Sequence, residues 1–261
     1  MLFVIDGDTL ATWTRDSDSD RTSVASWATV SLPKDATLML RGDTLYVATT
    51  VGSDYDRVAA DGTLSPVTVP TDGAVPVATT GDTITWGTNR GDVHLTSIDG
   101  DTDRDVSLVA PGDDATITRW VGGDTNHVYV AWDTGGTTTL AVHSLKTGKT
   151  VATHALKGDT RDATTLTLRD GSATALGTLI INTTTGAITE SPSTIQRTLG
   201  DSFLIENTDG TPMLLTPGGG SAELVGDDVE PVANLSDQLI VSHDGQLLAL
   251  TAHSKGGARM S

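Results

Sequence analysis

Short runs of alternating apolar and polar residues, each ended by a turn, fill this chain. The clearest stretch has a run over residues 37–40, a Gly42-Asp43 turn and a second run over residues 44–49. A third strand is expected near residues 57–60 and a fourth over residues 64–69. Alternation with a period of two between Gly/Asp turns predicts β-hairpins, and no segment keeps a helical period over three turns. The pattern therefore predicts an all-β protein.

The turn between the first two strands of such a unit recurs seven times. It is found at Gly7-Asp8, Gly42-Asp43, Gly81-Asp82, Gly123-Asp124, Gly171-Ser172, Gly200-Asp201 and Ser236-Asp237. Units of four strands and about 40 residues have the dimensions of propeller blades. We therefore predict a single domain over residues 1–261, a seven-bladed β-propeller of four-stranded antiparallel blades. The approximate blades are residues 1–34, 35–71, 72–112, 113–158, 159–191, 192–227 and 228–261.

The two ends of the repeat differ from its middle. The first unit opens directly with its innermost strand, at residues 2–5, and the seventh has three good strands near residues 231–233, 238–241 and 247–250. Residues 254–261 make a poor outer strand. Because an unpaired sheet edge is a liability, a propeller usually completes the blade at one terminus with a strand from the other. We expect the last blade to be incomplete, its missing strand upstream of Met1, and the chain to be a fragment of a longer protein.

Two turns between third and fourth strands carry a resemblance to a known family. Residues 140–151 read Leu-Ala-Val-His-Ser-Leu-Lys-Thr-Gly-Lys-Thr-Val, and residues 179–188 read Leu-Ile-Ile-Asn-Thr-Thr-Thr-Gly-Ala-Ile. Both resemble the repeat of quinoprotein-like (PQQ-like) propellers, in which a strand ends in a Leu-Asn/Asp-x-x-Thr-Gly-Lys turn. Members that use the quinone carry a tryptophan docking motif in each blade, and many have a vicinal cysteine pair. This chain has no cysteine, and its five tryptophans do not recur at one position. The resemblance therefore implies the cofactor-free scaffold branch of the bacterial envelope.

Charge narrows the classes of partner. The 34 acidic and 16 basic residues give a formal net charge of −18. Such a chain repels phosphate backbones and anionic lipid headgroups, so we expect no nucleic-acid partner. No run of about 18 apolar residues is found, so we expect no direct membrane insertion by this chain. The absence of cysteine excludes disulfides, thiol nucleophiles and cysteine-ligated metals.

Two runs of aspartate are candidate metal sites. The candidate ligands are Asp16, Asp18 and Asp20 in the first blade, and Asp99, Asp101, Asp103 and Asp105 in the third. Alternate aspartates on a tight turn can point several oxygens at one hard cation, as calcium loops do. The alternative is a solvated hairpin in which Asp forms the turn. No other cofactor is expected.

Histidine, arginine and tryptophan supply the remaining candidates. Three histidines on successive strands of the fourth blade, His127, His143 and His154, could gather around zinc, but no carboxylate or further histidine has a matching spacing, so we expect ordinary surface or inter-blade histidines. Candidate partner- or ligand-binding residues are Arg41, Arg119, Arg169 and Arg197, at or near the ends of innermost strands, with Trp13 and Trp27 near outer or rim positions. Four cations near one rim could bind an anionic ligand or an acidic partner, or could offset the surrounding aspartates.

No nucleophile elbow, Walker loop or His-Glu-x-x-His motif is present. We therefore expect a non-catalytic, protein-binding scaffold propeller, the extracytoplasmic domain of a longer membrane-anchored or envelope-associated bacterial protein. Its expected partner is a membrane or envelope protein. One alternative is a propeller enzyme acting on a glycan or small lactone, which needs ionisable residues converging on the channel mouth. A second alternative is a calcium-stabilised binding module.

Overall fold

The structure is a computed structural model of the 261-residue chain. It describes residues 2–6, 9–14, 26–42, 44–59, 61–157, 163, 165–168, 170–206, 210–218, 220–223, 230–235, 238–243, 246–253 and 257–260. The chain divides into two compact units, Met1–Val109 and Ala110–Ser261, which are treated separately below. The prediction of a single domain stays a prediction.

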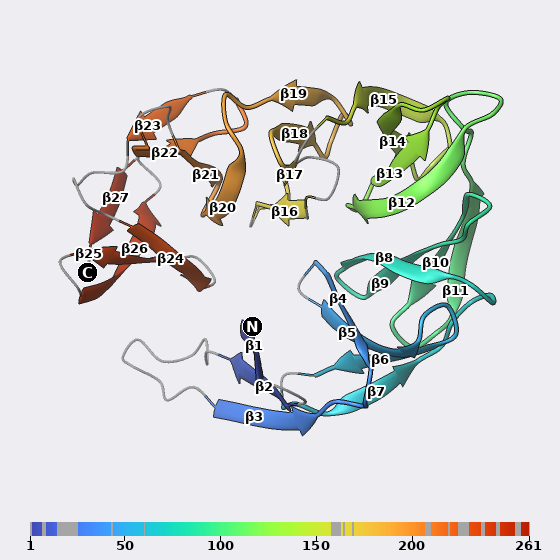
Figure 1. Ribbon diagram of the computed structural model, residues 1–261, viewed down its shortest axis with the longest axis horizontal. Helices are drawn as coiled ribbons and strands as arrows, with labels where there is room; N and C mark the ends of the chain where they lie inside the picture. Colours follow the sequence, from blue (N-terminus) through green and yellow to red (C-terminus); the bar gives the residue numbers. More distant parts are fainter. Residues whose placement is uncertain are drawn as a thin grey trace. The chain divides into compact units, whose positions relative to one another are not determined.

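The first unit holds three antiparallel sheets (Figure 1). Sheet 1 is β1 (Leu2–Asp6), β2 (Thr9–Thr14) and β3 (Ser26–Ser31). Sheet 2 is β4 (Thr37–Arg41), β5 (Thr44–Thr50), β6 (Asp54–Val58) and β7 (Leu64–Val67). Sheet 3 is β8 (Val75–Thr80), β9 (Thr83–Gly87), β10 (Asp92–Ser97) and β11 (Thr102–Ser107).

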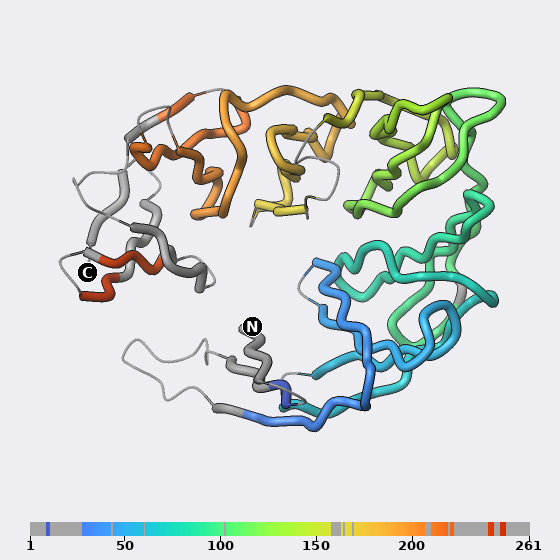
Figure 2. Tube along the Cα trace, in the orientation of Figure 1, coloured from blue at the N-terminus to red at the C-terminus, as the bar shows by residue number. Residues whose placement is uncertain are grey.

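The second unit holds four sheets of four strands each, and Figure 2 follows its chain from hairpin to hairpin. Sheet 4 is β12 (Thr116–Gly123), β13 (His127–Asp133), β14 (Thr138–Ser144) and β15 (Thr150–Ala155). Sheet 5 is β16 (Thr165–Thr167), β17 (Ala173–Leu176), β18 (Leu179–Asn182) and β19 (Ile188–Glu190). Sheet 6 is β20 (Ile195–Leu199), β21 (Ser202–Glu206), β22 (Pro212–Leu215) and β23 (Ser221–Glu223). Sheet 7 is β24 (Glu230–Leu235), β25 (Gln238–His243), β26 (Gln246–His253) and β27 (Gly257–Met260).

Every sheet is built from consecutive strands, each hydrogen-bonded to the next in the sequence. In each sheet the chain passes from the first strand to the second at one of the seven predicted Gly-Asp-type dipeptides. The described residues contain no helix, and therefore none that could cross a membrane. The all-β class and the seven antiparallel units of a β-propeller are confirmed, although the third strand of sheet 2 begins three residues earlier than predicted.

The core lies between consecutive sheets because both faces of the inner strands are apolar. On β5, Tyr46 packs toward sheet 3, whereas Val47 packs toward sheet 1. On β18, Ile181 packs toward sheet 4, whereas Ile180 packs toward sheet 6. Alternation with a period of two therefore directs successive side chains into two different cores, which is how stacked blades bury both faces of a strand.

The two turns that carried the family resemblance have the same hydrogen bonds. Gly148 N donates to Ser144 O over 2.8 Å, and Gly186 N donates to Asn182 O over 2.7 Å. In both turns the glycine has a positive φ, which a residue with a Cβ rarely adopts. A threonine hydroxyl one residue earlier accepts from the backbone N–H that follows the glycine. The sequence repeat is thus a structural repeat of sheets 4 and 5.

The expectation that the last blade is incomplete was wrong. Sheet 7 has four strands, because β27 pairs with β26 from Leu250↔Met260 to His253↔Gly257. Backbone pairing makes this strand, although its residues lack the alternation that marks the others. The sheet with three strands in the described part of the chain is sheet 1. The incomplete seventh blade was the reason to place a missing strand upstream of Met1, and that reason no longer holds.

Candidate functional site

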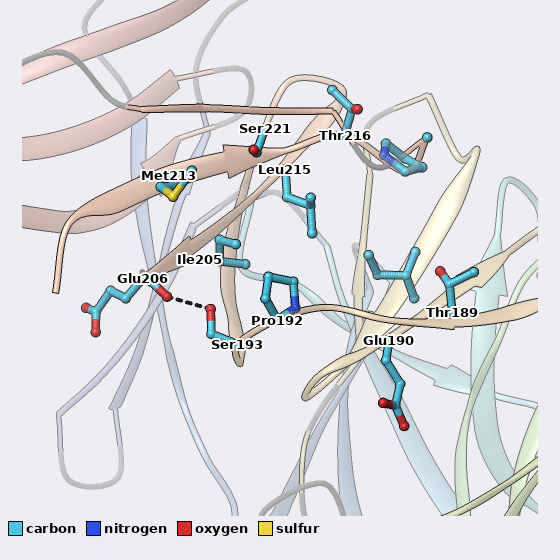
Figure 3. A pocket seen from close by; sticks show the side chains of 13 residues that line it. Thr189, Glu190, Pro192, Ser193, Ile205, Glu206, Met213, Leu215, Thr216 and Ser221 are labelled. Carbon is cyan, nitrogen blue, oxygen red and sulfur yellow. Dashed lines mark hydrogen bonds between the residues drawn. The ribbon is translucent and has the colours of Figure 1, made fainter. Parts of the chain in front are cut away.

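A pocket of about 520 Å³ opens between sheets 5 and 6 (Figure 3). Its lining comes from β18 and β19 of sheet 5, from the connection to sheet 6, and from β21, β22, β23 and the turn between the last two. The lining residues are Ile180, Thr189, Glu190, Pro192, Ser193, Ile205, Glu206, Met213, Leu215, Thr216, Pro217, Gly218 and Ser221. This volume falls within the ordinary range for binding pockets.

Short outer strands leave this space open. β19 and β23 have three residues each, whereas β15, the outer strand of sheet 4, has six. After β22 the chain turns through Pro217 and Gly218, and the turn is held by Thr216 N, which donates to Gly220 O over 2.8 Å. Proline cannot donate a backbone hydrogen bond to a sheet, so the turn ends the pairing of β22. Within the part of the chain that the structure describes, the outer strand of sheet 6 covers only part of the core behind it.

The floor of the pocket is the core between sheets 5 and 6. Ile180, Ile205 and Leu215 line the pocket and are only 5%, 2% and 7% exposed. They belong to one cluster with Phe203 and Ile195, and Met213 packs against it. These three side chains leave little area exposed, and the half-buried Met213 adds apolar surface, which a ligand can bury at about 25 cal/mol per Å². The pocket can therefore bind an apolar group.

Two carboxylates lie at the margin of the pocket. Glu190 Oε1 is 3.0 Å from His154 Nε2 on β15. Glu206 ends β21, and its backbone carbonyl accepts a hydrogen bond from Ser193 Oγ over 2.5 Å. Figure 3 shows both carboxylates pointing outward, on different sides, and away from the apolar floor. They are placed to meet charge at the surface rather than to act as an acid–base pair inside.

Glutamate is used differently from aspartate in this chain. All four glutamates, Glu190, Glu206, Glu223 and Glu230, fall between residues 190 and 230, whereas 30 aspartates are spread along the sequence. Several aspartates accept hydrogen bonds from backbone N–H groups two or three residues on, as at Asp61, Asp133 and Asp170. These are turn-forming roles that the longer glutamate side chain does not fill.

The lining offers little for catalysis. Its polar members are hydroxyls and the two outward carboxylates, with no histidine, lysine or arginine among its residues. General acid–base chemistry needs groups within hydrogen-bond reach of the reacting atoms. The arrangement of this pocket is therefore suited to binding.

Two of the predicted arginines hold neighbouring sheets together. Arg41 Nε donates to Pro76 O on β8 over 2.8 Å, and Arg119 donates from a guanidinium nitrogen to Ala163 O, just before β16, over 3.0 Å. In each case the first strand of one sheet reaches a backbone carbonyl of the next. Arg197 is half-buried on β20, and Arg169 lies outside the described residues. Arg41 belongs to the first unit and Arg119 and Arg197 to the second, so a common cationic rim and a partner-binding role for these residues stay predictions.

The aspartate runs make no metal site in the part of the chain that can be described. Asp99, Asp101, Asp103 and Asp105 are all exposed. Asp105 Oδ1 accepts a hydrogen bond from His94 Nδ1 over 2.7 Å. No three His, Asp or Glu side chains among the described residues are grouped so as to hold a metal ion. Asp16, Asp18 and Asp20 lie outside those residues, so calcium binding there stays a prediction.

The three histidines of sheet 4 have three separate environments. His127 Nδ1 lies 3.3 Å from Asp124 Oδ1 but makes no hydrogen bond. His143 accepts from Trp132 Nε1 over 3.1 Å and donates from Nδ1 to Gly148 O over 3.3 Å. Burial lowers the pKa of His143 to about 4, against the smaller opposing effect of the Gly148 carbonyl. With His154 facing Glu190, the structure does not bring the three together for zinc.

Asp124 centres a buried polar network that sequence reasoning missed. Its Oδ1 accepts from Asn126 N over 2.6 Å and from His127 N over 2.9 Å, and its Oδ2 accepts from the Tyr129 hydroxyl. Burial, followed by the Asp124 charge, raises the pKa of Tyr129. Asn126 Nδ2 extends the network to Thr183 O of sheet 5 over 3.3 Å. The network fixes the β12–β13 turn and ties sheet 4 to sheet 5.

Of the five tryptophans, two lie in the core, Trp120 is half-buried on β12, and the side chains of two lie outside the described residues. Trp86 is fully buried and Trp132 is 4% exposed, as expected of core residues. Trp13 and Trp27 are backbone partners across the β2–β3 pair, a register that the sequence did not indicate. Their side chains lie outside the described residues, so their role in a contact surface stays a prediction.

Comparisons with known proteins give likeness of fold and no more. No known family and no curated protein matches the chain. BamB from Moraxella catarrhalis is 18% identical, with 93% of this chain and 78% of that one covered and a TM-score of 0.41. Virginiamycin B lyase from Staphylococcus aureus is 15% identical over 96% and 90%, with a TM-score of 0.43. The Dos1 propeller is 13% identical over 94% and 79%, also with a TM-score of 0.43. At these values the similarity says nothing about what this chain binds.

Proposed function

We propose that this chain is a non-catalytic protein-binding module that receives part of a protein partner in the pocket between sheets 5 and 6. The observation that carries the proposal is the open apolar floor of Ile180, Ile205 and Leu215, which continues directly from the core. Propellers present binding sites on a rigid stack of sheets, where loops and outer strands vary at little cost to the fold.

We further propose that the module is extracytoplasmic and that its partner is a membrane or envelope protein. The support is the turn shared by sheets 4 and 5, which resembles the repeat of quinoprotein-like propellers, together with the absence of cysteine and of a recurring tryptophan, which points to the cofactor-free envelope branch of that family. Fractionation of cells that express the chain in its natural context tests the location. Recovery with cytoplasmic markers alone would contradict it.

Gly218 offers a way to block the pocket without disturbing the fold. It lines the pocket, is exposed and has no positive φ, and a Cβ added there meets no described atom within 4 Å. Gly112 shares these properties in the segment that precedes β12 and does not line the pocket. Gly218→Phe and Gly112→Phe are therefore a matched pair that adds the same ring at two open positions.

Site-specific photocrosslinking in the native cells tests the proposal. A photoreactive phenylalanine analogue at position 218 should crosslink to a defined protein partner, and the same analogue at position 112 should not. Gly218→Phe should remove the partner from a pull-down, and Gly112→Phe should retain it. A partner captured equally by both variants would place the binding surface elsewhere. No partner in any experiment would overturn the proposal in favour of the enzyme alternative.

A further inference from the structure

The pocket has the length of a short strand. Glu206 is opposite Pro212 and Phe203 is opposite Leu215 in the β21–β22 pair, so the lining residues Glu206 and Thr216 mark the two ends of β22. Four residues of strand span about 13 Å. One side of this groove is formed by β19, and the other by β22 and the start of β23. The shape fits a few residues of extended chain lying along the strands.

The chemistry of the groove changes along its length. The middle is apolar, with Met213 and Ile205 paired across the two strands and Ile180 facing them from sheet 5. One end carries the Glu206 carboxylate, for which the described residues provide no partner. Glu190, by contrast, already faces His154. An occupant that matches the groove has an aliphatic side chain in the middle and a cation toward the Glu206 end.

The wider charge favours the same occupant. Over the span of sheets 5 and 6, residues 165–223, the sequence contains six acidic residues and two basic residues, Arg169 and Arg197. A cation that approaches Glu206 therefore meets little competition from positive charge in these two sheets. Electrostatic complementarity of this kind speeds association and selects among partners.

Building on the function proposed above, we infer that the partner supplies an extended segment with a basic residue two positions from an aliphatic anchor. Side chains on the same face of an extended chain are two residues and about 7 Å apart. The aliphatic side chain lies on Ile180, Ile205 and Met213, and the Lys or Arg side chain reaches Glu206 outside the pocket. Ser193 Oγ, whose proton is donated to the Glu206 carbonyl, can accept a hydrogen bond from a backbone N–H of the segment, and the Ser221 hydroxyl can donate or accept one.

Three fluorescent octapeptides and the purified full chain test this inference. The probes are Gly-Ser-Lys-Thr-Leu-Thr-Ser-Gly, a version with Gln for Lys, and a version with Ser for Leu. In fluorescence anisotropy the first peptide should bind about fourfold more tightly than the Gln version at low salt, as expected for one exposed charge pair. This advantage should shrink at high salt. The Ser version should show no binding.

Two variants, one at each end of β21, test whether the Glu206 carboxylate is the group that attracts the lysine of the peptide. Glu206→Gln should abolish the preference for Lys over Gln, whereas Asp201→Asn should keep it. Asp201 is exposed at the opposite end of β21, so the two variants remove equal charge a strand apart. If both variants weakened the preference for the Lys peptide equally, the preference would come from net charge rather than from Glu206, and the inference would be overturned. A preference that survives Glu206→Gln would also overturn it.

The position-218 experiments separate this inference from the proposed function. Crosslinking to a partner from position 218, together with no binding of the Lys peptide, would leave the docking function standing and overturn the predicted segment. Peptide binding that persists in Gly218→Phe would place the peptide outside the pocket and also overturn it. Loss of both crosslinking and peptide binding would reject the two proposals together. Urea unfolding of each variant confirms that the fold is kept.

Discussion

The interface between sheets 4 and 5 is closed, whereas the interface between sheets 5 and 6 is open at its outer end. In the closed interface β15 and β19 approach each other, and Ala152 and Ile188 cover the core formed by Leu140, Leu176 and their neighbours. Gly186 of sheet 5 lies so close to sheet 4 that a Cβ would be 3.2 Å from His127 Nε2 and 3.1 Å from Val151 Cγ1. The Asp124 network completes this contact.

The open interface uses the same repeat with shorter outer strands. Its inner part is as well packed, with Phe203 fully buried and Ile205 at 2% exposure. Toward the outside β23 has three residues, and Met213 and Leu215, which pair with Glu223 and Ser221 of β23, line a pocket. The difference shows that a pocket can lie beside a short outer strand of a repeat fold while the inner strands pack as they do elsewhere.

The largest expected effect comes from deleting side-chain volume in the two interfaces. Leu140 is fully buried and surrounded by the core, so Leu140→Ala should leave a closed cavity and destabilise the chain by about 4 kcal/mol. Leu215 already borders the pocket, so the space left by Leu215→Ala joins an existing opening and should cost about 2 kcal/mol. Urea unfolding of both variants gives the comparison. Equal losses would show that the pocket is closed in solution.

The second prediction concerns acid, and it distinguishes sheet 4 from sheet 5. His143 occupies the position before the shared turn, where sheet 5 has Ile181. Because burial lowers the pKa of His143 from 6.5 to about 4, the unfolded chain binds a proton there more readily than the folded chain. The stability that depends on the neutral ring is present above about pH 6.5 and is lost as the pH falls toward 4. Its full size is about 3 kcal/mol at 1.36 kcal/mol per pKa unit.

Urea unfolding between pH 7 and pH 4.5 measures this effect. The many aspartates also contribute to acid sensitivity, so the comparison is between the wild-type chain and His143→Gln. The wild type should lose more stability than the variant over this range. Parallel losses in the two proteins would show that the ring is not held neutral by its burial beside Trp132 and Gly148.

Much of the fold could be predicted because its signals are local. The Gly-Asp-type dipeptides mark the first turn of every sheet, and the glycine has the positive φ that such a turn favours at four of them, Gly42, Gly81, Gly171 and Gly200. The bounds of a strand were harder to predict where the strand contains charged residues. On β6, Asp54 and Asp56 flank the buried Tyr55. The β27 strand was missed because pairing with β26, rather than its own residue pattern, makes it a strand.

The candidate site could not be predicted because it depends on contacts between sheets. The pocket forms where β19 and β23 are short, and strand length is the least certain part of a sequence prediction. Likewise, the bonds of Arg41 and Arg119 to carbonyls of the next sheet cannot be read from a sequence. One signal was present, since all four glutamates fall between residues 190 and 230 and two of them border the pocket.

A third prediction tests the close approach at the closed interface. Gly186 and Gly135 both have positive φ values, 72° and 77°, so Gly→Ala imposes similar backbone strain of about 1 kcal/mol at each. Only at Gly186 does the new methyl group also meet His127, Val142 and Val151. Gly186→Ala should therefore cost about 2 kcal/mol and Gly135→Ala about 1 kcal/mol by urea unfolding. Equal costs would mean that the sheets separate there without penalty.

The smallest expected effect comes from the ion pair at the outer edge of the closed interface. His154 and Glu190 are 32% and 67% exposed, so water screens the pair, and His154→Gln should change the stability by less than about 0.5 kcal/mol. The variant should also release the Glu190 carboxylate beside the pocket and strengthen binding of the lysine peptide slightly. A loss above 1 kcal/mol would show that the pair, rather than the apolar packing of Ala152 and Ile188, closes this interface. Closure would then depend on charge, and salt should open it.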